Sequence, residues 1–170
     1  MHILVADDEP PIAELLASVC ARAGHRVSTA TSAAGVVDCL RAHQLDLLVV
    51  DLDMADTGGL ELIRQARHMA SELPVIAMTM HPAAYPPEDV AAAGGADLLS
   101  KPFGMDQLGI RVALIEERRR YVTDLAARAR DARASLPEAP VLAPAAAAAG
   151  RSRSPILLFE RFRERRRGAA

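Results

Sequence analysis

Four short, mostly apolar runs that each end at a polar residue restrict the fold of this chain more than any other feature. They cover His2–Ala6, Leu47–Val50, Val75–Met78 and Ala96–Ser100. Runs of this length are typical of strands buried on both faces of a parallel sheet. Helical patterns separate them, so strand and helix alternate along the chain. This alternation predicts an α/β fold, a five-stranded parallel sheet with helices on both faces.

The segments between the apolar runs complete five strand–helix units. A short second strand is expected over residues 26–29, and glycines or prolines mark most helix ends. Five helices are expected. The first covers residues 11–22, the second begins after a cap at Thr31 or Ser32, and the third begins at Gly58 and Gly59. Three prolines delay the fourth to about residues 88–93, and the fifth begins near Met105.

Five polar residues directly follow the apolar runs. They are Asp7, Asp8, Asp51, Thr79 and Lys101. In open α/β sheets, ligands bind outside the carboxyl ends of the strands. Each residue alone has an ordinary structural explanation, such as an Asp that caps the next helix. Together they predict that three carboxylates, a hydroxyl and an ammonium converge at one edge of the sheet.

This combination of side chains predicts phosphoryl chemistry that depends on Mg²⁺. Crowded carboxylates repel one another, and Mg²⁺ relieves the repulsion because it prefers oxygen ligands. A bound Mg²⁺ can also contact phosphoryl oxygens. Asp51 can then attack phosphorus to form an aspartyl phosphate. Lys101 and the Thr79 hydroxyl can bind two of the phosphoryl oxygens.

Five segments around these positions carry a specific resemblance to a known family. They are Ile3–Pro10, Asp51–Met54, Gly58–Leu60, Val75–Thr79 and Gly95–Phe103. In these segments the chain resembles the receiver domains of two-component response regulators. The resemblance covers roughly residues 1–120. It implies a flavodoxin-like sheet with strand order 2-1-3-4-5.

The resemblance also implies a role for each site residue. Asp51 would be the phosphoacceptor, supplied by a sensor histidine kinase or a phosphotransfer protein. Thr79 and Lys101 would bind the phosphoryl group and couple it to a signalling surface. The Mg²⁺ ligands would be Asp7, Asp8, Asp51 and the backbone carbonyl of Asp53. The protein would act as a phosphoprotein in phosphorelay signal transduction rather than as an enzyme that turns over a separate substrate.

Two residues depart from the usual receiver pattern. Leu98 stands three residues before Lys101, where the family usually has Tyr or Phe, so the usual aromatic switch is absent. Met80 stands where the family usually has a small residue. We expect its side chain to slow both phosphotransfer and hydrolysis, and unchanged rates in Met80→Ala would contradict this. The fourth helix is also rich in proline, so output through the last helix is expected instead.

The chain after the receiver segment suggests an output by protein contact. A helical pattern continues from 106 to about 136, with the apolar series Leu108, Ile115, Val122, Ala129 and Leu136 at intervals of seven. A solvated stalk and a pairing helix both fit this half-heptad pattern, so a homodimer through residues 106–136 stays open. Residues 121–136 would extend the last helix.

Residues 137–170 would form a Pro/Ala linker and an Arg-rich tail without a folded output domain. We expect the tail to be disordered in isolation. A short helix that docks on a downstream protein or an anionic membrane is the alternative.

Composition narrows the classes of function further. Residues 1–104 hold 14 Asp and Glu against 6 Lys and Arg, whereas residues 151–170 hold 2 against 7. An acidic body argues against a DNA-binding domain.

Cys20 and Cys39 lie in helical patterns, where buried thiols are common. The chain opens with a strand rather than a signal peptide, and no apolar run approaches the roughly 20 residues of a membrane span. We therefore expect a cytoplasmic protein.

Three other functions remain as alternatives. The protein could be a scaffold that works without phosphorylation and retains a vestigial receiver site. It could be a Mg²⁺-dependent phosphatase in which Asp53 serves as general acid beside the nucleophile Asp51. It could also bind nucleic acid through the Arg-rich end, which would make the binding strongly dependent on salt.

Overall fold

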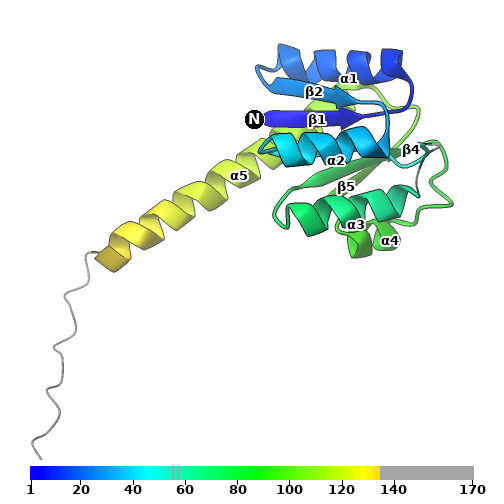
Figure 1. Cartoon of the computed structure of the whole chain (residues 1–170). Helices are drawn as coiled ribbons and strands as arrows, with labels where there is room; N and C mark the ends of the chain where they lie inside the picture. The colour runs from blue at the N-terminus through cyan, green and yellow to red at the C-terminus, as the bar shows by residue number, and fades with distance from the viewer. Residues whose placement is uncertain (55, 57, 135–170) are drawn as a thin grey trace, which may run out of the picture. The chain divides into compact units, whose positions relative to one another are not determined.

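The computed structural model describes residues 1–54, 56 and 58–134. In this part of the chain, five strands and five helices alternate (Figure 1). The strands are β1 (His2–Ala6), β2 (Arg26–Ala30), β3 (Leu47–Asp51), β4 (Val75–Thr79) and β5 (Asp97–Ser100). The helices are α1 (Pro10–Arg22), α2 (Ala33–Ala42), α3 (Gly59–Met69), α4 (Pro87–Ala93) and α5 (Met105–Ala134). Residues 1–130 form one compact unit, which contains the sheet and most of α5.

The strands form a single parallel sheet in the order β2-β1-β3-β4-β5, which confirms the predicted fold. β1 pairs with both β2 and β3, so the chain crosses over at β1 and then proceeds in one direction through β4 and β5. In such sheets the switch point, between β1 and β3 here, is where ligands bind. The carboxyl ends of β1 and β3 therefore mark the expected site.

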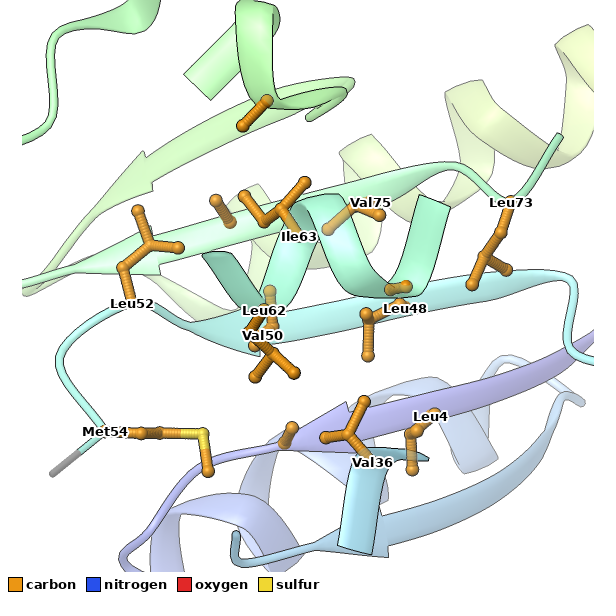
Figure 2. Packing of buried hydrophobic residues seen from close by; sticks show 14 of the residues in the cluster. Leu4, Val36, Leu48, Val50, Leu52, Met54, Leu62, Ile63, Leu73 and Val75 are labelled. Atoms are coloured by element: carbon orange, nitrogen blue, oxygen red, sulfur yellow. The ribbon is translucent and has the colours of Figure 1, made fainter. Parts of the chain in front are cut away.

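Two apolar clusters cover the two faces of the sheet. Leu4 and Ala6 of β1 point to one face, where α2, α3 and α4 pack. Ile3 and Val5 point to the other face, where α1 and α5 pack. The cluster beneath α2 and α3 is shown in Figure 2. Because both faces are covered, β1, β3 and β4 are buried along their whole length, as their apolar runs predict.

Local sequence explains how the helices next to the site begin. Ser32 accepts a hydrogen bond from the Gly35 N–H, so Ser32 rather than Thr31 caps α2. At the start of α3, a Cβ on Gly59 would lie 2.5 Å from the Leu52 Cα atom. Only glycine fits this contact, which presses α3 against the residue that follows Asp51.

The observed boundaries agree with the predicted ones to within one or two residues. α4 begins at Pro87 and ends where Gly94 takes a φ of 102°, so the prolines do delay this helix. α5 extends to Ala134, and the predicted position Leu136 and the segment 137–170 lie outside the described residues. Within the described ranges, no helix is both long and apolar enough to cross a membrane.

The two cysteines differ in burial. Cys20 is buried in the α1 contact with the sheet, as expected, whereas Cys39 is only partly buried at the edge of the other cluster. Burial raises the pKa of both thiols. Both therefore behave as packing residues rather than as reactive thiolates.

Candidate functional site

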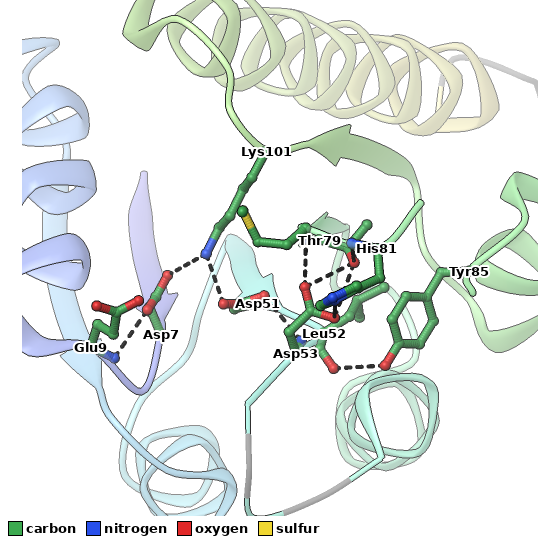
Figure 3. A network of polar contacts seen from close by, with 10 residues as sticks. Asp7, Glu9, Asp51, Leu52, Asp53, Thr79, His81, Tyr85 and Lys101 are labelled. Atoms are coloured by element: carbon green, nitrogen blue, oxygen red, sulfur yellow. Dashed lines mark hydrogen bonds and ion pairs between the residues drawn. The ribbon is translucent and has the colours of Figure 1, made fainter. Parts of the chain in front are cut away.

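The predicted polar residues meet at the carboxyl edge of the sheet, as Figure 3 shows for the labelled ones. Asp7 and Lys101 follow β1 and β5, while Asp51 and Thr79 end β3 and β4. Parallel strands bring these positions together because all their carboxyl ends lie on one side. Asp7 and Thr79 are fully buried and Asp51 is 5% exposed. Buried polar groups need partners, and two connected networks supply them.

The first group is a cluster of three carboxylates. Asp7, Asp8 and Asp51 each offer an oxygen atom, and these oxygens lie within 4.8 Å of one another. Asp8 is exposed, so the cluster opens to solvent on its side. Oxygen donors at this spacing, with one open side, fit a small divalent cation that keeps several waters. The site residues therefore suit Mg²⁺.

Lys101 joins two of these carboxylates. Its Nζ lies 2.8 Å from Asp7 Oδ2 and 2.7 Å from Asp51 Oδ2. Burial acts to lower the pKa of Lys101, but the hydrogen bonds and charges of Asp51 and Asp7 outweigh it and raise the pKa. The ammonium is thus held charged against the carboxylate that the sequence singles out as nucleophile.

Backbone N–H groups hold the remaining oxygens of this pair. Asp51 Oδ1 accepts a hydrogen bond from the Asp53 N–H at 3.0 Å. Asp7 Oδ1 accepts one from the Glu9 N–H at 3.1 Å. Each carboxylate is therefore fixed at both oxygens, which orients Asp51 at the edge of the sheet.

A second network is centred on the carboxylate of Asp53. The Thr79 hydroxyl donates to Asp53 Oδ2 at 2.9 Å, and the Met80 N–H donates to the same oxygen. His81 Nδ1 lies 3.2 Å from Asp53 Oδ1, and the His81 N–H donates to Thr79 Oγ1 at 2.9 Å. Burial acts to raise the pKa of Asp53, but the hydrogen bonds from Met80, Thr79 and His81 outweigh it and lower the pKa.

Sequence reasoning missed this second network. It gave Asp53 a backbone carbonyl for Mg²⁺ or, in the phosphatase alternative, the role of general acid, and it did not consider His81 as a site residue. The available signal was spacing: Asp53 lies two residues after Asp51, and His81 lies two residues after Thr79, at the ends of adjacent strands. In the structure, Thr79 lies at the predicted edge of the sheet. Its hydroxyl also donates a hydrogen bond to Asp53 and accepts one from the His81 N–H, two residues further along the chain.

A tyrosine that the sequence did not single out also reaches the site. The Tyr85 hydroxyl donates to the Leu52 carbonyl at 3.0 Å, and its half-buried ring packs against the cluster beneath α3. Burial raises the pKa of Tyr85, and the charges of Asp53 and Asp51 add to this. The bond links the segment before α4 to the residue that follows Asp51.

The two residues that depart from the receiver pattern lie at different depths. Met80 is 57% exposed, with only its backbone N–H in the Asp53 network. Leu98 is half-buried and packs against the same cluster as Tyr85. An aliphatic side chain at position 98 offers no hydrogen-bond donor to the site.

Comparison with known proteins identifies the family. Residues 3–113 match the model of the response regulator receiver domain. The chain is 28% identical to the probable transcriptional regulatory protein TcrX of Mycobacterium tuberculosis over 68% of its length and 50% of that protein. It is 35% identical to the alginate biosynthesis transcriptional regulatory protein AlgB of Pseudomonas putida over 66% of its length and 25% of that protein.

A solved structure agrees with these sequence matches. The response regulator protein TrrA of Thermotoga maritima, solved in complex with Mg²⁺-BeF, is 27% identical and superposes with a TM-score of 0.61. The match covers 67% of this chain and 97% of TrrA. The chain spans half or less of the lengths of TcrX and AlgB. This chain therefore belongs to the response regulator receiver domain family.

Proposed function

We propose that Asp51 accepts a phosphoryl group from a phosphohistidine of a sensor kinase or phosphotransfer protein. The observation that carries the proposal is the buried Asp51 carboxylate, held by Lys101 beside Asp7 and Asp8 at the switch point of the sheet. An ammonium at 2.7 Å and neighbouring carboxylates suited to a cation are the groups that phosphoryl transfer requires.

The transfer uses the Asp51 carboxylate as nucleophile. One of its oxygens donates an electron pair to phosphorus, the P–N bond to the imidazole breaks, and the imidazole nitrogen keeps that bonding pair. Lys101 remains close enough to neutralise charge on the transferred group. Mg²⁺, held by Asp7, Asp8, Asp51 and the Asp53 carbonyl, would neutralise further charge on the phosphoryl oxygens, which the Mg²⁺-BeF complex of TrrA supports.

Thr79 connects the phosphoryl group to the rest of the domain. Its hydroxyl donates to Asp53, and a phosphoryl group on Asp51 offers a competing, more highly charged acceptor. When Thr79 changes partner, the Met80–His81 segment loses one of its anchors. Phosphorylation then shifts a pre-existing equilibrium between two arrangements of this segment.

The output is protein contact rather than DNA binding by the receiver itself. The receiver segment has an acidic balance, which disfavours a nucleic-acid surface. We assign residues 1–120 to the receiver and the part of α5 beyond them, as far as Ala134, to an extension of its last helix. The segment 137–170 lies outside the described residues, and its assignment to a linker and tail stays a prediction from sequence. The helix or the tail then contacts a downstream protein in the cytoplasm, and α5 also offers a surface for a homodimer.

The phosphatase alternative is weakened by the state of Asp53. A general acid must carry a proton, yet the Asp53 carboxylate accepts hydrogen bonds from Thr79 and Met80, and its pKa is lowered. Asp53 therefore stays ionised near neutral pH. We propose a stoichiometric phosphoacceptor and not an enzyme that turns over a phosphate ester.

Incubation with a small phosphodonor and Mg²⁺, followed by intact mass measurement, tests the proposal. We expect the wild-type chain to gain one phosphoryl group and Asp51→Asn to gain none. Asp38→Asn, a matched change at an exposed acid of α2, should behave as wild type. A wild-type chain that stays unmodified would favour the scaffold, and multiple turnovers of a phosphate ester would favour the phosphatase.

A further inference from the structure

A cavity of about 630 Å³ lies at the amino end of the sheet, away from Asp51. Its walls are the end of α3 with the loop to β4, the turn between α4 and β5, and the middle of α5. This volume falls within the range of small-molecule sites. The lining residues of α5 have the spacing of one helical face and are Ile115, Arg118, Arg119, Val122 and Thr123.

The cavity explains the later part of the heptad series in α5. Leu108 is fully buried against the sheet, and Ile115, one heptad later, is partly buried there. Val122, a further heptad along, is 57% exposed and lines the cavity. Between them, the Arg119 guanidinium binds Asp46, the residue before β3, so α5 passes the end of the sheet at this point. The same face of α5 therefore packs on the sheet first and then forms a wall of the cavity.

The charged residues of the lining leave a positive excess. Three arginines line the cavity with one carboxylate, and these residues are Arg67, Arg118, Arg119 and Glu72. Asp46 compensates Arg119, so two guanidinium groups remain against Glu72. Within the described part of the chain, Glu72 and Arg118 take part in no ion pair. An anion would therefore find uncompensated positive charge here.

Arg67 is already fixed in the wall of the cavity. Its Nη1 donates to the Leu73 carbonyl at 2.9 Å. Its side chain also lies against Gly94, where a Cβ would come within 2.8 Å of Arg67 Cγ. A guanidinium has five N–H donors, so the bond to Leu73 leaves others for a ligand. A donor that is held in advance loses little conformational entropy when it binds.

We propose that this cavity binds a small organic oxyanion, with its charged group at Arg67 and Arg118 and its apolar body against Val122 and Pro74. Guanidinium groups bind such anions through paired N–H donors, and apolar walls favour a ligand with a hydrophobic body. The inference goes beyond the proposed function and does not depend on it, because the cavity and Asp51 lie at opposite ends of the strands. A bound ligand would connect α5 to the turn before β5.

Titration of the full chain with 2-naphthoate tests the site, and the neutral amide of the same acid, 2-naphthamide, is the matched control. Backbone amide shifts in NMR spectra report both the affinity and the place of binding. We expect saturable binding of 2-naphthoate, with the largest shifts in residues 91–96 and 115–123. The amide should bind about tenfold more weakly, because it cannot form charge-assisted hydrogen bonds with the arginines.

Charge changes in the lining should act in opposite directions. Arg118→Gln should weaken the binding of 2-naphthoate by about tenfold, because it removes one of the two uncompensated cations. Glu72→Gln should strengthen it by about threefold, because it removes a carboxylate that repels the ligand. Both side chains are exposed, so neither change should disturb the fold. Arg41→Gln, the same loss of charge on exposed α2, should bind as wild type.

Three results would overturn the proposal. The first is no saturable binding of 2-naphthoate, or shifts centred outside the cavity. The second is equal binding of the acid and its amide, which would mean that charge plays no part. The third is weaker binding in Glu72→Gln or stronger binding in Arg118→Gln, which would mean that the cavity prefers a cation. No phosphodonor is present, so each of these results would leave the proposed chemistry at Asp51 unaffected.

Discussion

The hydroxyl of Thr79 donates to the carboxylate of Asp53, with 2.9 Å between Thr79 Oγ1 and Asp53 Oδ2. Asp53 also accepts from the Met80 N–H, so one carboxylate holds both the residue that ends β4 and the residue that follows it. Thr79 must leave this acceptor before it can donate to a phosphoryl group on Asp51. Asp53 thus competes with the phosphoryl group for the same donor.

Removal of the Asp53 carboxylate should favour phosphorylation. Asp53→Ala keeps the backbone carbonyl but frees Thr79 and Met80. A hydrogen bond to a charged group contributes about 1.5–3 kcal/mol. We therefore expect the rate of phosphorylation by a small phosphodonor to rise by about tenfold or more. The rate is read from mass spectra taken over time. Asp38→Ala serves as control, and equal rates in wild type and Asp53→Ala would show that Asp53 does not restrain Thr79.

The acid sensitivity of the fold should depend on Asp53. The pKa of Asp53 in the folded protein lies below the usual value for an aspartate. The contacts of its carboxylate therefore add to the free energy of unfolding above about pH 4, and this contribution disappears as the pH falls through the lowered pKa. Asp53→Asn should therefore be less stable than wild type at neutral pH and approach it at low pH. Urea unfolding between neutral and acidic pH measures this difference. A difference that is constant across the range would contradict the assignment.

Lys101 should be energetically coupled to Asp51. Lys101→Met leaves two buried carboxylates without their cation, which we expect to cost about 3–5 kcal/mol. The double variant D51N/K101M should cost less than the sum of the single changes, because Asp51→Asn removes one of those charges. Urea unfolding of the four proteins gives the coupling free energy. Added Mg²⁺ should recover part of the loss in Lys101→Met, and additive single effects would argue against coupling.

The Tyr85 hydroxyl should tie the segment before α4 to the site. Tyr85→Phe keeps the ring but loses the bond to the Leu52 carbonyl, and we expect a loss of about 1 kcal/mol in the free energy of unfolding. Hydrogen exchange between residues 80 and 93 should become faster. Tyr121→Phe removes the same atom from a residue that is 68% exposed, and its effect should stay within about 0.5 kcal/mol. Equal effects of the two changes would mean that the Leu52 bond contributes nothing.

Two adjacent glycines offer a matched test of the contact behind Asp51. A Cβ on Gly59 would meet Leu52 backbone at 2.5 Å, whereas a Cβ on Gly58 would meet nothing within 4 Å. Gly59→Ala should therefore cost about 1–3 kcal/mol and slow phosphorylation, because Leu52 must move. Gly58→Ala should stay within about 1 kcal/mol of wild type. Thermal unfolding and the phosphorylation rate together check this, and similar results for both variants would rule out the contact as a constraint on the site.

Much of the fold could be predicted because local patterns were strong. The apolar runs over β1, β3 and β4 are buried on both faces, which leaves little choice other than a central parallel strand. The residues directly after those runs then had to share an edge. This is why Asp7, Asp51 and Thr79 were found together from sequence.

The heptad series in the last helix shows where sequence reasoning stopped. Leu108 and Ile115 recur at intervals of seven, and in the structure this side of α5 packs on the sheet. The exposed apolar side chains of Ile110 and Leu114 lie on the opposite side of the helix, and the sequence pattern did not single them out. A helix with two apolar faces has no single period, so only its packing shows which face is left exposed.

By itself, the sequence determined how strands and helices alternate along the chain. It also determined which residues stand at the carboxyl edge of the sheet. Short-range periodicity and the alternation of elements carry that information. Only the tertiary structure decided that Asp53 rather than Asp51 holds Thr79, and that Tyr85 bonds to Leu52. These partners are 26 and 33 residues apart, and the choice among acceptors a few ångströms apart depends on how the loops after β3 and β4 pack.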